Sequence, residues 1–207
     1  MKYQKIFVIG YNKTGTKSFH KLFTSLGFSS QHNRKGWEIN NCKCFSDGFH
    51  DKGKFIEYDQ KFENSLFILN TRPLNNWLKS RSKHGYCHLR RGVWPPSSKQ
   101  YIEWIQQRDE HFNEIIDYFY NKNDRLLICN IEKDGWENFI ASNLMINNTK
   151  NYNIHENKIE ESKIDAEAVS LINEELDKAY LNLGYGEEDK NKLLPNNQYI
   201  SLYKQYL

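Results

Sequence analysis

The chain has 207 residues, of which 38% are hydrophobic and 14% aromatic, so it is long enough to bury one substantial core and too short for two full domains. Its 29 Lys and Arg residues against 26 Asp and Glu residues leave a net charge of +3, well short of the basic footprint of a nucleic-acid-binding protein. We therefore expect a single globular domain over residues 1–207, and no nucleic acid among its partners.

Membrane and metal signals are weak throughout the sequence. No stretch approaches the roughly 18 to 20 apolar residues of a membrane span, and residues 1–20 hold only the short apolar run KIFVIG. We expect a cytoplasmic protein without a membrane span. The cysteines lack the paired spacing of metal ligands, so we expect reduced thiols and no metal site. They are Cys42, Cys44, Cys87 and Cys129.

The first half of the chain contains two units that read as a strand followed by a helix. In the first, a β-branched and aromatic run at 5–10 precedes a helical apolar pattern that extends from Gly15 to Gly27. In the second, an apolar run at 66–70 precedes a helix opened by Pro73. The pattern predicts alternating strands and helices.

The second half continues this alternation. Apolar residues at helical spacing predict a long helix over 101–119, capped by the serines at 97–98. A third strand is expected at 125–130, followed by a short helix around Trp136. After a polar, irregular stretch, a last helical stripe runs over 169–183 and stops at a glycine.

Strands that alternate with helices favour a parallel sheet covered on both faces, with ligand-binding groups gathered at the carboxyl ends of the strands. We therefore expect an α/β fold with three layers, α/β/α, around a central and mostly parallel sheet. It should be similar to the P-loop-containing nucleotide-binding folds.

The stretch GYNKTGTKS, residues 10–18, lies between the first strand and the first helix, where glycines let backbone N–H groups converge on an anion. In nucleoside triphosphatases this loop reads G-x-x-x-x-G-K-[ST], with the lysine directly after the second glycine. Here Thr16 takes that place, Lys17 follows one residue late and Lys13 precedes Gly15. The strands also end in FILN and LLICN, without the aspartate that holds Mg²⁺ in such enzymes.

The same stretch, VIGYNKTGTKS, resembles the 5′-phosphosulfate loop of sulfotransferases, in which a K-[ST]-G-T core follows the first strand. That family transfers a sulfuryl group from 3′-phosphoadenosine 5′-phosphosulfate (PAPS). The resemblance implies that Lys13 lies beside the bridging oxygen of the phosphosulfate. It also implies backbone and hydroxyl donors from Thr14, Gly15, Thr16, Lys17 and Ser18. A transferring sulfuryl group carries less negative charge than a phosphoryl group, so a lysine and a cradle of N–H groups can stabilise the leaving oxygen without a metal.

A second segment, ILNTRPLNNWLKSR at 68–81, resembles the 3′-phosphate motif of that family, an arginine at a strand end with a serine eight residues later in the helix. Arg72 and Ser80 match this motif, and the long Arg72 fork can reach a phosphate that Ser80 also contacts. Residues 131–137, 153–158 and 183–185 carry a softer resemblance to the same family. The sequence lacks the C-terminal R-K-G with which the cytosolic branch of the family makes additional contacts to the 3′-phosphate.

The catalytic base is expected in the polar segment 44–51, which reads as a loop between the two motifs. An acceptor hydroxyl or amine needs a base within hydrogen-bond reach, and histidine or a carboxylate is the usual choice. Asp47 is the first candidate, because similar proteins often have an aspartate in this stretch. His50 and then His32 follow, although a lone residue of either type is more often a cap or a solvated side chain.

The acceptor is not identified by the sequence. A basic and aromatic group after the second motif either lines an acceptor pocket or forms a solvated turn. It comprises His84, Tyr86, His88, Arg90, Arg91 and Trp94. The sequence thus predicts a metal-independent, PAPS-dependent sulfotransferase acting on a carbohydrate, lipid or other small acceptor. A P-loop nucleotide kinase or hydrolase that uses Lys17, and a non-catalytic nucleotide-binding protein, remain alternatives.

Overall fold

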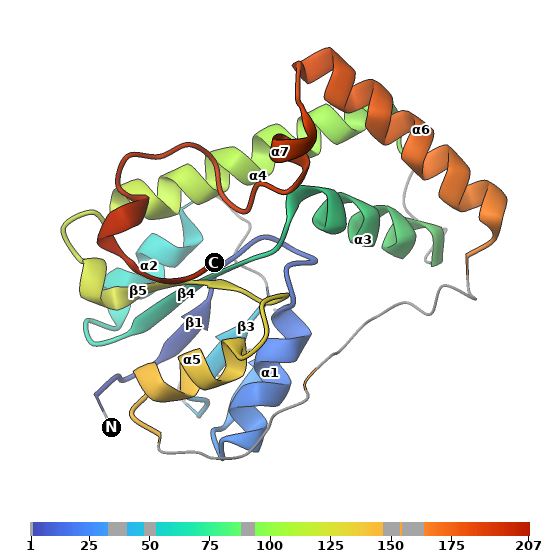
Figure 1. The fold of residues 1–207 in the computed structure, drawn as a ribbon. Helices are drawn as coiled ribbons and strands as arrows, with labels where there is room; N and C mark the ends of the chain where they lie inside the picture. Colours follow the sequence, from blue (N-terminus) through green and yellow to red (C-terminus); the bar gives the residue numbers. More distant parts are fainter. Residues whose placement is uncertain (1, 33–40, 48–52, 88–93, 147–153, 155–163) are drawn as a thin grey trace.

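The computed structural model describes residues 2–32, 41–47, 53–87, 94–146, 154 and 164–207. Its centre is a six-stranded sheet in the order β2-β3-β1-β4-β5-β6, and every neighbouring pair is parallel (Figure 1). The strands are β1 (Ile6–Val8), β2 (Ser30–His32), β3 (Cys44–Ser46), β4 (Leu66–Thr71), β5 (Leu126–Asn130) and β6 (Lys204–Tyr206).

Helices connect the strands and cover the sheet. They are α1 (Thr16–Ser25), α2 (Lys54–Lys61), α3 (Leu74–Cys87), α4 (Ser98–Tyr118), α5 (Trp136–Asn143), α6 (Ala166–Leu183) and the short α7 (Glu187–Lys190). Figure 1 shows α1 and α5 on one side of the sheet and α2 and α4 on the other. The expected α/β/α architecture around a parallel sheet is therefore confirmed.

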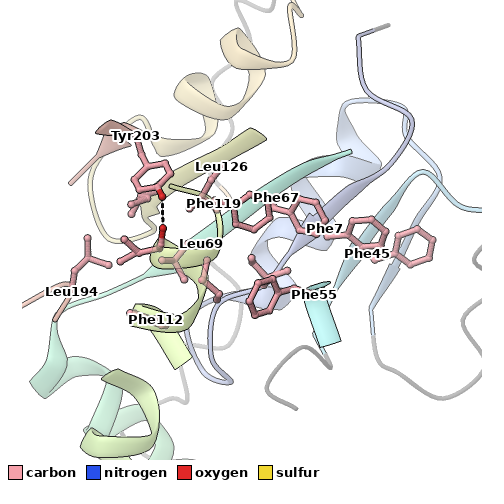
Figure 2. Packing of buried hydrophobic residues seen from close by; sticks show 14 of the residues in the cluster. Phe7, Phe45, Phe55, Phe67, Leu69, Phe112, Phe119, Leu126, Leu194 and Tyr203 are labelled. Carbon is pink, nitrogen blue, oxygen red and sulfur yellow. Dashed lines mark hydrogen bonds between the residues drawn. The ribbon is translucent and has the colours of Figure 1, made fainter. Parts of the chain in front are cut away.

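The face toward α2 and α4 is rich in aromatic side chains (Figure 2). Phe7 of β1 stacks between Phe45 of β3 and Phe67 of β4, with ring centroids 5.4 and 5.3 Å away. Phe55 of α2 and Phe112 of α4 complete this part of the cluster from the helix layer. All five side chains are fully buried, so this face supplies a large share of the apolar burial that stabilises the fold.

The opposite face packs against α1 and α5. Because side chains alternate along a strand, Ile6 and Ile68 point to this side while their neighbours point to the other. Phe19 of α1 meets Trp136 of α5, with ring centroids 4.8 Å apart. The two helices thus form a second continuous apolar layer.

The long helix α4 belongs to two clusters. Its C-terminal half covers the sheet, whereas Tyr101 and Ile105 in its N-terminal half pack with α3 and α6. Ser97 caps α4 by accepting a hydrogen bond from the N–H of Gln100 at 3.3 Å, as expected from the sequence. Helix α6 ends at Gly184 in a left-handed conformation, also as expected.

The C-terminal segment returns across α4 and adds β6 to the edge of the sheet beside β5 (Figure 1). Arg108 of α4, which is 1% exposed, donates to the carbonyl of Leu193 at 2.5 Å and to Thr71 Oγ1 at 3.4 Å. The hydroxyl of Tyr203 donates to the carbonyl of Ile116, as Figure 2 shows. These contacts fix the segment on the sheet.

The expected loop at 44–51 is wrong in its first part, because Cys44–Ser46 forms the buried strand β3 between β2 and β1. Strands β2, β3 and β6 have three residues each and, unlike the equally short β1, do not lie within a longer apolar run that would mark them in the sequence. Asp47 consequently follows a strand at the carboxyl edge of the sheet, where ligand-binding groups gather in such folds.

The structure describes the thiols of three cysteines. Cys42, Cys44 and Cys129 are free, and burial strongly raises the pKa of the Cys44 and Cys129 thiols. Within the described residues, none of the helices has both the length and the apolar character needed to cross a bilayer.

Candidate functional site

The loop between β1 and α1 contains two residues with a positive φ angle. Lys13 and Gly15 both adopt left-handed conformations, with φ of 66° and 91°. Left-handed residues alternating with right-handed ones turn successive N–H groups toward one concave side. Helix α1 then begins at Thr16 with no acidic residue in its first turn, so its N-terminal amides and dipole favour an anion.

Asn70, fully buried at the end of β4, clamps both ends of this loop. Its Oδ1 accepts a hydrogen bond from the N–H of Gly10 at 2.8 Å, while its Nδ2 lies 2.7 Å from both the carbonyl and the hydroxyl oxygen of Thr14. A Cβ at Gly10 would lie 2.2 Å from the Asn70 carbonyl oxygen, so only glycine fits there. These hydrogen bonds fix the loop against β4.

Residues that follow β5 and residues of α4 also contact the loop and the end of β1. A Cβ on Gly15 would lie 2.3 Å from Cδ1 of Ile131, which follows β5 and packs against the turn. The buried ring of His111 on α4 has its Nε2 2.9 Å from the carbonyl oxygen of Ile9. The positions of Gly15 and of the strand end before the loop are thus set by neighbouring elements.

Helix α3 holds the first half of the loop. The indole N–H of Trp77 donates to the carbonyl of Asn12 at 2.8 Å, and Arg81 donates to the Asn12 side chain at 2.6 Å. The Arg81 guanidinium lies over the rings of Trp104 and Tyr11, 4.3 and 5.4 Å from their centroids. Burial lowers the pKa of Arg81, partly offset by Tyr11.

Arg72 directly follows β4 and reaches the loop from the neighbouring strand. Its Nη1 donates to the carbonyl of Lys13 at 3.3 Å, and its Nη2 forms an ion pair with Glu132. The other carboxylate oxygen of Glu132 accepts from Asn76 at 2.7 Å. The Nε of Arg72 is buried and has no hydrogen-bond partner in the part of the chain that the structure describes.

The side chains of the remaining predicted loop residues are either buried in the protein or exposed to solvent. The Thr14 hydroxyl, expected as a ligand donor, is fully buried, donates to Tyr11 and accepts from Asn70, so it is already engaged inside the loop. Thr16 and Ser18 are also buried in the first turn of α1, whereas Lys17 is exposed.

Ser80 lies in α3, partly exposed, on the helix that follows Arg72. Across the described ranges, no hydrogen bond joins Ser80 to Arg72. The structure therefore brings Arg72 to the loop, and a phosphate shared with Ser80 stays a prediction.

A second group of polar side chains lies at the ends of β2 and β3. Nδ1 of His32 is 3.2 Å from the Ser46 hydroxyl, and its Nε2 is 4.0 Å from Oδ2 of Asp47. Burial is the main cause that lowers the pKa of His32, and Asp47 opposes it. The charges of His20, Lys17 and Lys13 lower the pKa of His32 further, so the loop between β1 and α1 acts electrostatically on this pair.

Some predicted residues lie elsewhere. His50, His88, Arg90 and Arg91 lie outside the described residues. The rings of Tyr86 and Trp94 pack together with centroids 4.7 Å apart, and the Tyr86 hydroxyl donates to Asp165 at 2.6 Å. These two aromatic residues tie α3 to the segments around it.

Sequence reasoning did not assign roles to Asn70 or Glu132. A polar residue at the end of an otherwise apolar strand was the available signal for Asn70, because a buried amide must find partners.

In the ranges described, no group of three or more His, Cys, Asp or Glu side chains is arranged to hold a metal ion. Neither a scan against protein-family models nor a search of curated proteins finds a match for this chain.

Proposed function

We propose that this chain is a PAPS-dependent sulfotransferase. The observation that carries the proposal is the convergence of two cationic anchors at one edge of the sheet. One is the loop in which Lys13 has a left-handed conformation and Asn70 clamps both ends. The other is Arg72, which leaves the neighbouring strand and contacts the same loop.

The available donors suit a nucleotide that carries two separate anionic groups. The loop N–H groups and the N-terminus of α1 would hold the 5′-phosphosulfate. Arg72 would hold the 3′-phosphate, because a guanidinium binds phosphate through paired donors and its buried Nε has no partner among the described residues. An ordinary nucleoside triphosphate has no 3′-phosphate for this second anchor.

When bound, PAPS would supply the sulfuryl group and a phosphate leaving group. In this proposal Lys13 stabilises the negative charge that develops on the departing oxygen. The clamp by Asn70 keeps the loop amides in position, so little reorganisation accompanies the reaction.

The proton of an acceptor hydroxyl or amine goes to the pair formed by His32 and Asp47. With the imidazole neutral, as its lowered pKa favours, the pair accepts one proton, and the carboxylate 4.0 Å away then stabilises the imidazolium. We therefore propose that Asp47, our first candidate for the base, acts together with His32. The acceptor would be a carbohydrate, a lipid or another small molecule.

Calorimetric titration with adenosine 3′,5′-bisphosphate in the presence of EDTA tests the proposal. We expect binding without Mg²⁺, weakened about tenfold or more in Lys13→Ala, because a hydrogen bond to a charged group contributes about 1.5 to 3 kcal/mol. Lys204→Ala, a change at an exposed lysine on the edge strand β6, should bind normally.

A preference for Mg²⁺-ATP over the bisphosphate would contradict the proposal and favour a P-loop kinase or hydrolase. Binding of PAPS without transfer to any member of a broad acceptor panel, unchanged by Lys13→Ala, would favour a non-catalytic binding protein.

A further inference from the structure

Glu132 binds part of the Arg72 guanidinium, the group that the proposed function assigns to the 3′-phosphate. Its carboxylate forms an ion pair with Nη2 of Arg72 and accepts a hydrogen bond from Asn76 at 2.7 Å. The Arg72 and Glu132 side chains are 20% and 28% exposed, so the pair lies at the border of the solvent.

The turn that carries Glu132 is fixed by the sheet. The N–H of Ile131 donates to the carbonyl of Thr71 at 3.1 Å, and the N–H of Glu132 donates to the side chain of Asn130 at 3.0 Å. The backbone of Glu132 is therefore held next to Arg72. Its carboxylate is partly exposed, so the side chain can rotate away from Arg72.

The contact uses only part of the Arg72 fork. Nε and Nη2 form one edge of a guanidinium, and this edge is the one that a phosphate or carboxylate can bind with two parallel hydrogen bonds. Here Glu132 takes Nη2, and Nε is without a partner among the described residues. A phosphate that binds this edge must displace Glu132 from Nη2.

We propose that Glu132 competes with the 3′-phosphate for Arg72 and so limits how strongly the chain distinguishes a 3′-phosphate from a 3′-hydroxyl. This inference rests on the proposed function. A ligand with a 3′-phosphate gains the contact with Arg72 but loses the pair between Arg72 and Glu132. A ligand with a 3′-hydroxyl leaves that pair intact. Glu132 thus lowers affinity only for the first ligand, which favours release of a 3′-phosphorylated product.

Calorimetry with adenosine 3′,5′-bisphosphate and adenosine 5′-monophosphate tests this inference on the intact chain. We expect Glu132→Gln to bind the bisphosphate about two- to fivefold more tightly, the range of a partly exposed ion pair. Its affinity for the monophosphate should not change. Glu63→Gln, which removes the same charge from an exposed site after α2, should change neither affinity.

A variant that removes the second hold on the carboxylate provides an independent check. Asn76→Ala should also tighten the bisphosphate, by less than Glu132→Gln, and it decides the question if Glu132→Gln does not fold. Unchanged or weaker bisphosphate binding in the folded variants would overturn the inference, because Glu132 would then be neutral or would support Arg72. If the wild-type chain binds both ligands equally, Arg72 does not read the 3′-phosphate, and the proposed function fails as well.

Discussion

Replacement of Asn70 by alanine should loosen the loop between β1 and α1 and destabilise the whole chain. The substitution removes the hydrogen bond from the N–H of Gly10 and both contacts to Thr14, all inside the protein. It leaves a buried backbone N–H and a buried carbonyl without their partners. Each such group costs about 1 to 3 kcal/mol, so we expect a loss of about 2 to 6 kcal/mol in the free energy of unfolding.

Urea denaturation followed by tryptophan fluorescence measures this loss, since Trp77 and Trp136 are buried and report on the folded core. Asn64→Ala is the matched control, because Asn64 is exposed near the amino end of the same strand β4. The control should change stability by less than about 0.5 kcal/mol. Equal effects of the two substitutions would show that the hydrogen bonds of Asn70 do not stabilise the loop.

Three further predictions concern the loop, the histidines and the C-terminal segment. In urea denaturation, Gly15→Ala should lower the free energy of unfolding by about 1 to 3 kcal/mol more than Gly27→Ala does. Both glycines are left-handed, but only a Cβ at Gly15 meets a neighbour within 4 Å. Equal losses would show that the contact with Ile131 does not limit the size of residue 15. Burial lowers the folded pKa of His20 and His32 below the unfolded value of about 6.5, so stability should be full above that pH and fall as the pH drops through the folded values. The decline in urea midpoint between pH 7.5 and 5.5 should be smaller in His20→Gln/His32→Gln, and an unchanged decline would exclude these groups. Arg108→Met should speed hydrogen exchange in β6 by loosening the preceding segment, and unaltered exchange would show that the segment is fixed by other contacts.

The sequence was sufficient for the elements with long, periodic patterns. The apolar runs at β4 and β5 and the helical stripes of α1, α4 and α6 predicted those elements and the layered architecture. Strand β2 reads Ser30-Gln31-His32 and is only partly buried, so its place in the sheet comes from pairing with β3 and not from its own hydrophobicity. Such short strands are decided by tertiary contacts that no local pattern reveals.

The candidate site was predictable where glycine and charge mark the chain itself. The glycines and Lys13 indicated a phosphate loop, and the structure gives Lys13 and Gly15 left-handed conformations. The role of Asn70 depends on β4 lying parallel beside β1, and that of Glu132 depends on β5 lying beside β4. Such contacts can be predicted only when the order of the strands in the sheet is known. The alternation of strands and helices along the sequence does not determine that order.

The role proposed for Arg72 is tested most directly by calorimetry without Mg²⁺, in which the wild-type chain and Arg72→Ala are each titrated with adenosine 3′,5′-bisphosphate and with adenosine 5′-monophosphate. We predict that the wild-type chain prefers the bisphosphate and that Arg72→Ala loses this preference, with about a tenfold or greater drop in bisphosphate affinity. Monophosphate affinity should change little. A preference that survives in Arg72→Ala, or one that is absent from the wild-type chain, would contradict the assignment of Arg72 to the 3′-phosphate.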